Sequence, residues 1–254
     1  MTPTSEPEVM AGAEAWSVPG GPHGALVLHG FTGNPNSMRG VAEALAGAGF
    51  TVELPRLPGH GTTIDYMLTT TWADWSGAAE AAYADLAARC PRVVVVGLSV
   101  GGALTAWLAS RHPEIAGIVT INPLVEAPDG VVDLLQGMVD AGESVMDGIG
   151  SDIADPDSVE SAYAQTPLVP LLSLLDAATA LAAGMAQIAC PVLILTSPQD
   201  HVVAPTNSDT LAAAVTGPVE RVTLARSYHV ATLDYDRAEL EQRTVDFATK
   251  VCTG

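Results

Sequence analysis

The chain has 254 residues, of which 48% are hydrophobic and 15% charged, and this composition excludes intrinsic disorder. Lysine and arginine total 10 against 29 aspartate and glutamate residues, a formal net charge of −19. Such a surface repels phosphate backbones and anionic bilayers, which excludes nucleic-acid binding and polybasic membrane docking. The length fits one α/β domain that carries an insertion.

The cysteines and the N-terminal residues indicate a cellular compartment. Cys90, Cys190 and Cys252 are too few to pair completely, and no Cys/His cluster indicates zinc. We therefore expect reduced structural thiols in a cytoplasmic protein. The first residues, MTPTSEPEVMAGAEAW, lack a basic region followed by an apolar stretch, so we expect no signal peptide. Two long uncharged stretches, Val93 to Ser110 and Ala177 to Gln199, contain glycine or proline and are interpreted as strands joined to helices, not membrane spans.

Short apolar runs alternate with helical stretches along most of the chain. Most runs are continuously apolar, which is typical of parallel strands covered on both faces. The expected strands are Ala25–His29, Thr51–Leu54, Arg92–Val96, Gly117–Ile121, Val192–Thr196 and Arg221–Ala225. The expected helices are Ser37–Gly47, Thr71–Arg89, Gly102–Ser110 and Asp209–Ala214. Asn36 or Ser37 is the candidate N-cap of the first helix. The alternation predicts a doubly wound α/β sheet.

The interval from Pro123 to Ala189 breaks this alternation. It contains no strong strand, although a crossover between parallel strands needs only about a dozen residues. Helical patches at Val131–Met138 and Leu168–Met185 surround an acidic, irregular stretch, Gly148–Glu160. We interpret residues 123–189 as a helical cap over the sheet; peripheral helices that contact no ligand are the alternative. The core then comprises residues 1–122 and 190–254.

Gly97-Leu98-Ser99-Val100-Gly101 fits the pattern G-x-S-x-G, follows a predicted strand and opens a predicted helix. A sharp strand-to-helix turn strains Ser99, and the flanking glycines let neighbouring backbones pass closely. The serine oxygen is then expected at the C-terminal edge of the sheet, where α/β folds bind ligands. The context favours a nucleophile over a chance Gly/Ser turn.

A serine hydroxyl becomes a nucleophile when a base takes its proton, and that base is expected after the last strand. His229 follows Arg221–Ala225, and Asp200 follows Val192–Thr196. The order Ser99, Asp200, His229 is therefore the order of a catalytic triad in this type of sheet. Asp129 is the second choice for the acid.

Other histidines and aspartates fit these roles less well. His60 and His112 do not follow the final strand, and His201 is adjacent to the candidate acid, where a hydrogen bond between the two is difficult. Asp234 and Asp236 are interpreted as solvated loop or helix-cap residues.

Acyl transfer also needs amide donors for a tetrahedral oxyanion. The N–H of Val100, directly after the serine, is one candidate. The N–H of Phe31, in the loop His29-Gly30-Phe31-Thr32-Gly33, is the other. His29 and His60 are interpreted as residues that brace loops. This chemistry requires no cofactor and no metal, and we expect none.

The segments HGFTG, GLSVGG, PQDHVV and SYHVATLDYD, in this order, resemble the α/β-hydrolase esterases, and in particular bacterial monoacylglycerol lipases and related carboxylesterases. The similarity runs from about residue 29 to residue 236. It implies an α/β-hydrolase fold with a mostly parallel doubly wound sheet and a helical cap. It also implies Ser99 as nucleophile, His229 as general base and acid, Asp200 as its orienter, and the Phe31 and Val100 amides as the oxyanion hole.

Two details qualify this resemblance. Such lipases often have methionine or leucine after the serine, where this chain has Val100; the backbone donor is kept, whereas the pocket width can change. The cap segments Gly148–Asp152 and Glu160–Tyr163 also resemble the lipases, which implies that Ile149 and Glu160 contact a glycerol head group.

The cap is otherwise divergent. A carboxylate at position 160 can accept hydrogen bonds from glycerol hydroxyls and disfavours substrates whose hydroxyls are esterified; a solvated surface acid is the alternative. Leu168, Val169 and Leu171 are candidates for an acyl channel or for packing within the cap.

The sequence thus predicts a serine hydrolase of carboxylic esters, with monoacylglycerols of medium or longer chain as favoured substrates. The alternatives are a general short-chain carboxylesterase, an acyltransferase and a non-catalytic lipid-binding module. Ser99 argues against the dehalogenases and epoxide hydrolases of this fold, which use an aspartate nucleophile.

Overall fold

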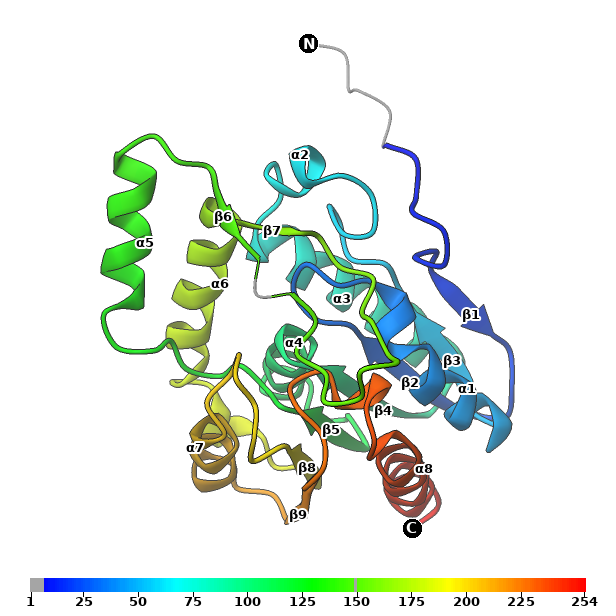
Figure 1. Cartoon of the computed structure of the whole chain (residues 1–254). Helices are drawn as coiled ribbons and strands as arrows, with labels where there is room; N and C mark the ends of the chain where they lie inside the picture. Colours follow the sequence, from blue (N-terminus) through cyan, green and yellow to red (C-terminus); the bar gives the residue numbers. More distant parts are fainter. Residues whose placement is uncertain (1–6, 149) are drawn as a thin grey trace.

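One seven-stranded sheet organises the computed structural model, which describes residues 7–148 and 150–254 (Figure 1). Every neighbouring pair is parallel except the first, which is antiparallel. In spatial order the strands are β1 (Trp16–Val18), β3 (Thr51–Leu54), β2 (His23–Leu28), β4 (Arg92–Leu98), β5 (Gly117–Ile121), β8 (Val192–Thr196) and β9 (Val219–Thr223). The predicted mostly parallel sheet is confirmed, and β1 is an antiparallel edge strand that we did not predict.

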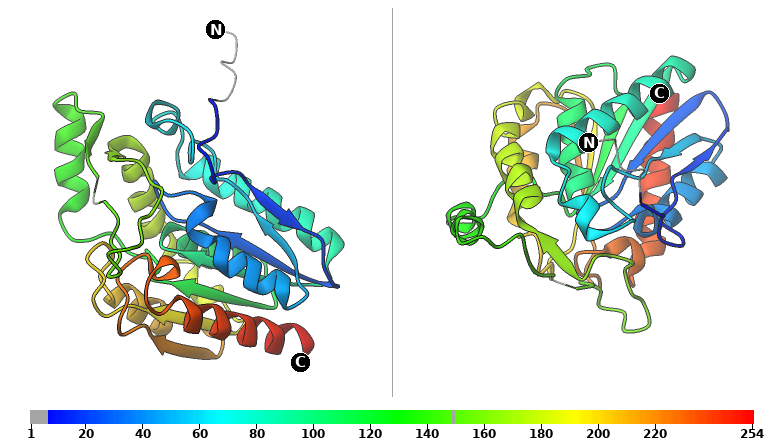
Figure 2. Two further views of the ribbon diagram at one scale, coloured as in Figure 1. Left: turned by 45° about the vertical axis from the view of Figure 1, so that its right-hand side comes forward. Right: turned by 90° about the horizontal axis from the view of Figure 1, so that it is seen from above.

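Alternate residues of the central strands enter two separate hydrophobic cores. Leu26 and Leu28 of β2 belong to one, whereas Ala25 and Val27 belong to the other. The first lies under α3 (Trp72–Arg89) and α4 (Val100–Ala109); the second lies under α1 (Arg39–Gly47) and α8 (Arg237–Thr253). Figure 2 shows these helices on opposite faces of the sheet. A sheet buried on both faces explains its continuously apolar strands.

The start of the first helix differs from the prediction. A 3₁₀ turn, Pro35–Met38, precedes α1, and Asn34 caps it by accepting a hydrogen bond from the N–H of Asn36 at 3.0 Å. Met38 therefore occupies the N-cap position of α1 and makes no side-chain cap bond. The prediction of Asn36 or Ser37 as N-cap was wrong because an extra turn precedes the helix.

Between β5 and β8 the chain forms α5 (Val131–Asp140), β6 (Val145–Asp147), β7 (Gln165–Pro167) and α6 (Leu168–Leu181). Both predicted helical patches are confirmed, and the short antiparallel pair β6–β7 is an addition. Helix α6 packs on α3 and α4, while α5 packs on α6 and is outermost (Figure 2). The remaining elements are α2 (Ile64–Met67), α7 (Thr206–Ala214) and 3₁₀ turns at Met185–Gln187 and Ala231–Leu233.

The cysteines and the uncharged stretches fit into this fold as expected. All three cysteines are free thiols; Cys90 and Cys252 are buried and Cys190 is partly exposed. The stretch Val93 to Ser110 forms most of β4 and all of α4, and Ala177 to Gln199 contains the end of α6 and all of β8. Within the described residues, no helix has the length and apolar character needed to cross a membrane.

Candidate active site

Ser99 lies on a sharp turn between β4 and α4. Its φ of +56° and ψ of −114° are unusual for a side chain with a Cβ, and its N–H donates to Ile121 O at 2.9 Å. The flanking glycines are required by space, because a Cβ on Gly97 would lie 2.0 Å from Gly101 O. A Cβ on Gly101 would lie 2.1 Å from Leu28 O. The close approach of three backbone segments thus holds the serine in a strained position.

Asp200 and His229 meet where the loops after β8 and β9 converge. Nδ1 of His229 lies 2.7 Å from Oδ2 of Asp200, and both side chains are buried, at 8% and 1% exposure. The other carboxylate oxygen accepts the N–H groups of Val202 and Val203, each at 2.8 Å. A carboxylate can only accept, so Nδ1 donates and Nε2 keeps a free lone pair. That nitrogen can take a proton.

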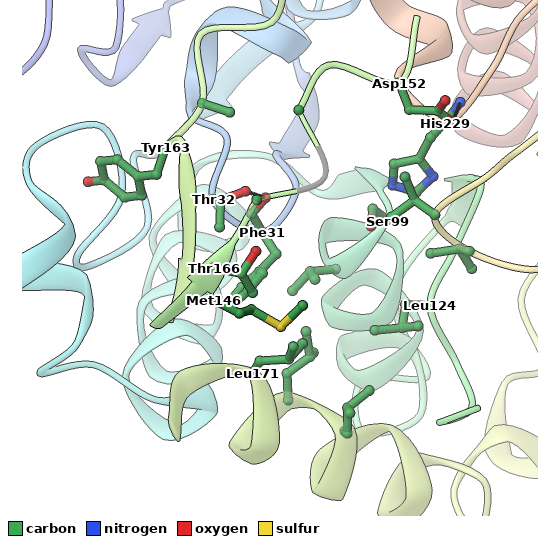
Figure 3. Close-up of a pocket in the computed structure, with 18 of the residues that line it drawn as sticks. Phe31, Thr32, Ser99, Leu124, Met146, Asp152, Tyr163, Thr166, Leu171 and His229 are labelled. Carbon is green, nitrogen blue, oxygen red and sulfur yellow. Dashed lines mark hydrogen bonds between the residues drawn. The ribbon is translucent and has the colours of Figure 1, made fainter. Parts of the chain in front are cut away.

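A pocket of about 410 Å³ opens above this edge of the sheet, and Ser99 and His229 both line it. Figure 3 shows them together at one end, with Leu171 of α6 toward the other. Most of the remaining lining is apolar: Leu124, Val131, Leu134, Leu135, Met146, Leu174 and Leu175. The pocket therefore combines one polar end with a chamber suited to a hydrocarbon chain.

The two predicted amide donors also lie at this pocket, which Phe31 and Val100 both line. Val100 is the first residue of α4, where the N–H has no intrahelical partner. In the part of the chain that the structure describes, neither amide has a protein acceptor. The N-terminal end of α4 also favours negative charge here.

The loop that carries Phe31 is braced by buried rings. His29 has Nδ1 2.9 Å from Gly30 O and accepts the N–H of Leu57 on Nε2 at 3.1 Å. The rings of His60 and Trp75 pack edge-on against Phe31. Burial lowers the pKa of His29 to about 4 and lowers that of His60 well below its usual value. The interpretation of both histidines as structural is consistent with these contacts.

Glu160 reaches the same pocket from the segment between β6 and β7. Its own N–H donates to Ser151 Oγ at 2.9 Å, and the following segment is fixed where Tyr163 N–H donates to Thr32 O at 3.2 Å. Its carboxylate lies over Gly33, because a Cβ there would be 2.7 Å from Oε1. Burial raises the pKa of Glu160 to about 7, and this effect exceeds that of a positive charge on His229, which lowers the pKa.

The other cap candidates separate into two groups. Leu171 lines the pocket, whereas Leu168 is buried in the core and Val169 is 47% exposed, so neither of these contributes to an acyl channel. Ile149 lies outside the described residues.

A family model described as the alpha/beta hydrolase fold matches residues 26–149. Over 245 residues the chain is 46% identical to "Thermostable monoacylglycerol lipase" of Bacillus sp. (strain H-257), covering 95% of this chain and 96% of that relative. The chain belongs to the α/β-hydrolase family.

Two further comparisons agree with this membership. A "Carboxylesterase" of Bacillus subtilis (strain 168) is 25% identical over 234 residues, which cover 91% of this α/β-hydrolase and 94% of the relative. A solved structure from work on LipS and LipT, two metagenome-derived lipolytic enzymes, is 40% identical with a TM-score of 0.92. It covers 96% of this chain and 100% of its own. The fold and the family are thus shared over almost the whole length.

The remaining histidine and aspartate candidates of this α/β-hydrolase lie in other surroundings. Asp129 is exposed, and His112 contacts Glu80 and Glu114 at 2.7 and 3.1 Å. His201 is 60% exposed and pairs with Asp152 at 2.8 Å. Among the described residues, no three His, Cys, Asp or Glu side chains are grouped to hold a metal ion.

The interpretation of Asp234 and Asp236 as solvated loop residues was wrong, although Asp236 does occupy the alternative helix-cap position, as N-cap of α8 without a side-chain cap bond. Their exposures are 0% and 4%, because each carboxylate accepts backbone N–H groups of the loop that carries His229. Asp152, which was not predicted as a site residue, lines the pocket and accepts the N–H of His229 at 3.0 Å. Its partner is 77 residues away, and no local pattern indicates such a contact.

Proposed function

We propose that this protein is a serine hydrolase in which Ser99 is the nucleophile, His229 the general base and acid, and Asp200 its orienter. The observation that carries the proposal is the buried 2.7 Å contact between His229 and Asp200, at a pocket that Ser99 also lines. The loops after β8 and β9 bring together residues that are far apart in the sequence, which is the requirement for a catalytic triad.

In the proposed reaction, Nε2 of His229 removes the Ser99 proton as Oγ attacks the ester carbonyl. The developing oxyanion is placed against the Val100 and Phe31 amides and the N-terminus of α4. The protonated imidazole then gives its proton to the leaving alcohol, and an acyl-enzyme remains. Water, activated by the same nitrogen, releases the carboxylic acid and restores the serine. No cofactor enters these steps.

The favoured substrate is a monoacylglycerol, the substrate class that appears in the name of the 46% identical relative. The apolar chamber lined by α5 and α6 suits an acyl chain of medium or longer length, and Glu160 offers an acceptor to free hydroxyls at the polar end. A diacylglycerol would leave that acceptor without one of its donors. Ile149 stays a predicted contact to the glycerol head group.

Residues 123–189 act in this proposal as a cap that selects the substrate, and the rest of the chain as the core that performs the chemistry. The cytoplasmic location expected from the unpaired cysteines remains part of the proposal. A general short-chain carboxylesterase is the second candidate, because a carboxylesterase matches 91% of the chain at 25% identity.

The deciding experiment compares initial rates on mono-, di- and triacylglycerols of one acyl length, with Ser99→Ala as control. A strong preference for the monoester that is lost in the control is the expected result. Fast turnover of simple short esters with little activity on monoacylglycerol would instead favour the carboxylesterase. Added alcohol acceptors test for acyl transfer, and labelling by a fluorophosphonate distinguishes an enzyme from a lipid-binding module.

A further inference from the structure

Asp152, a cap residue with no part in the proposed reaction, contacts the loops of both Asp200 and His229. One carboxylate oxygen accepts the backbone N–H of His229 at 3.0 Å and that of His201 at 3.1 Å. The other lies 2.8 Å from Nδ1 of His201. The side chain is 11% exposed. One cap carboxylate therefore holds the residue after the proposed acid and the proposed base itself.

Asp234 makes the reciprocal connection from the core to the cap. One of its oxygens accepts the N–H groups of Ala154 at 2.7 Å and Tyr228 at 2.9 Å. The other accepts the N–H of Asp155 at 3.1 Å. Its exposure is 0%. We use the name clasp for Asp152, Asp234 and the backbone amides from which their carboxylates accept hydrogen bonds.

We infer that Asp152 is a positioning residue for His229, an inference that rests on the proposed function. A general base must be fixed within a fraction of an ångström relative to its serine. Asp200 fixes the His229 ring through Nδ1, whereas Asp152 fixes its backbone through the N–H. The main-chain oxygen of Asp152 also accepts the N–H of Val230 at 3.1 Å, which holds the next residue too.

The clasp also restricts how the cap can move. The segment from Asp152 to Asp155 cannot leave the core without releasing the backbone of His229. Movement of the cap that admits substrate must therefore occur outside this segment, and loss of the clasp must impair turnover more than substrate binding.

The test uses Asp152→Ala and Asp152→Asn in the full chain, with p-nitrophenyl acetate as a small ester that requires little of the acyl chamber. Alanine removes both side-chain acceptors and keeps the main-chain oxygen that accepts the N–H of Val230. Asparagine can still turn its oxygen toward the two backbone amides and its NH₂ toward a neutral His201 ring, so it keeps the clasp without the charge. Asp157→Ala is the matched control, because Asp157 is an exposed acid of the same cap segment.

For Asp152→Ala we expect kcat to fall about 10- to 100-fold with KM within about twofold of the wild type. Asp152→Asn is expected to recover kcat to within about threefold, and Asp157→Ala to match the wild type. In proton NMR spectra, the downfield signal of the His229 Nδ1 proton should move or broaden in Asp152→Ala and persist in Asp152→Asn. Unchanged kcat in Asp152→Ala, or equal losses in both variants, would overturn the inference.

If Asp152→Ala does not fold, Asp152→Glu decides the question. Its longer side chain keeps the charge and displaces the clasp by one methylene, and we expect about a 10-fold loss of kcat; wild-type kcat would refute positioning. A wild-type protein that neither hydrolyses the ester nor reacts with a fluorophosphonate would refute the proposed function instead, so the two failures are distinguishable.

Discussion

Two carboxylates, that of Asp200 in a loop of the core and that of Glu160 in the cap segment that faces it, differ in their hydrogen-bond partners. The carboxylate of Asp200 accepts three hydrogen bonds, all from its own loop or the loop of His229. Glu160 lines the same pocket, yet no group in the described chain donates a hydrogen bond to its carboxylate, and burial raises its pKa to about 7. The carboxylate of Asp200 thus has its hydrogen-bond partners without a ligand, whereas that of Glu160 has no donor within the described chain.

This difference separates the residues that perform the chemical step from those that set substrate preference. A buried carboxylate that accepts no hydrogen bond lowers the stability of the folded protein. A ligand with hydroxyl groups can supply the missing hydrogen-bond donors. Substitutions on the core side should therefore remove the chemical step for every ester. Substitutions around Glu160 should change which ester is preferred and how stable the free protein is.

The largest effect is expected from Ser99→Ala, which removes the proposed nucleophile from the core side. Hydrolysis of p-nitrophenyl butyrate should fall by about 10⁴-fold or more. Circular dichroism and the melting temperature should stay close to those of the wild type, because only one hydroxyl is lost. Substantial activity in this variant would contradict the assignment.

Asp200→Asn tests the next member of the core side. The amide can donate to Nδ1 of His229 and so stabilise the wrong tautomer, and we expect kcat to fall by about 10³- to 10⁴-fold. The matched variant is Asp129→Asn, at the exposed second-choice acid. An unchanged rate in Asp200→Asn with a loss in Asp129→Asn would move the acid to Asp129.

Glu160→Gln tests the cost of the cap carboxylate. Because folding raises the pKa of Glu160 from 4.5 to about 7, its contribution to stability is present below pH 4.5 and is lost as the pH rises through 7. Glutamine does not ionise, so the variant does not lose this stability as the pH rises. We expect its free energy of unfolding, relative to the wild type, to rise by about 2 kcal/mol between pH 5 and pH 8. Urea unfolding at both pH values measures it; a constant difference would contradict buried ionisation.

The same variant should weaken discrimination between substrates. Hydrogen bonds to a charged acceptor exceed those to a neutral amide by about 1.4 kcal/mol, which corresponds to a tenfold effect. We expect the ratio of kcat/KM for mono- over diacylglycerol to fall about 10-fold in Glu160→Gln. Glu143→Gln, at an exposed acid of the cap, serves as control. Equal ratios in all three proteins would remove Glu160 from head-group recognition.

The smallest effect is expected from Gly33→Ala, which perturbs Glu160 indirectly. The added Cβ would lie 2.7 Å from Oε1 of Glu160, so the carboxylate must shift. We expect the same ratio to fall about threefold, or by about 0.6 kcal/mol. Gly47→Ala, where a Cβ would meet nothing within 4 Å, is the matched control. An unchanged ratio in Gly33→Ala would show that the exact place of the carboxylate is unimportant.

Much of the core and its site could be predicted because the necessary signals are local. Continuous apolar runs mark most of the parallel strands; Ser99 directly follows β4, and Asp200 and His229 lie in the loops that come after β8 and β9. Parallel strands deliver their following loops to one edge of the sheet, so residues distant in the sequence could be assigned to one site.

The parts that could not be predicted depend on contacts between distant segments. Asp234 looked solvated because nothing near it in the sequence reveals that it accepts the N–H of Ala154, 80 residues earlier. Asp152 similarly has its partner 77 residues away. Strand β1 has only three residues, too few for a pattern, and the polar sequence of α8 gave a weak signal although one side of it is buried.

The turn around Ser99 also sets rules for anyone who wishes to change the substrate range by directed evolution. Gly97 and Gly101 admit no side chain, since their neighbours are backbone atoms that cannot move aside. In random libraries that vary these two codons, we expect most of the variants at these positions to be inactive. Diversity placed at Leu134 and Leu171, which line the chamber from two different cap helices, leaves the turn intact. The residues that can be varied and those that must be preserved therefore lie in separate segments of the gene.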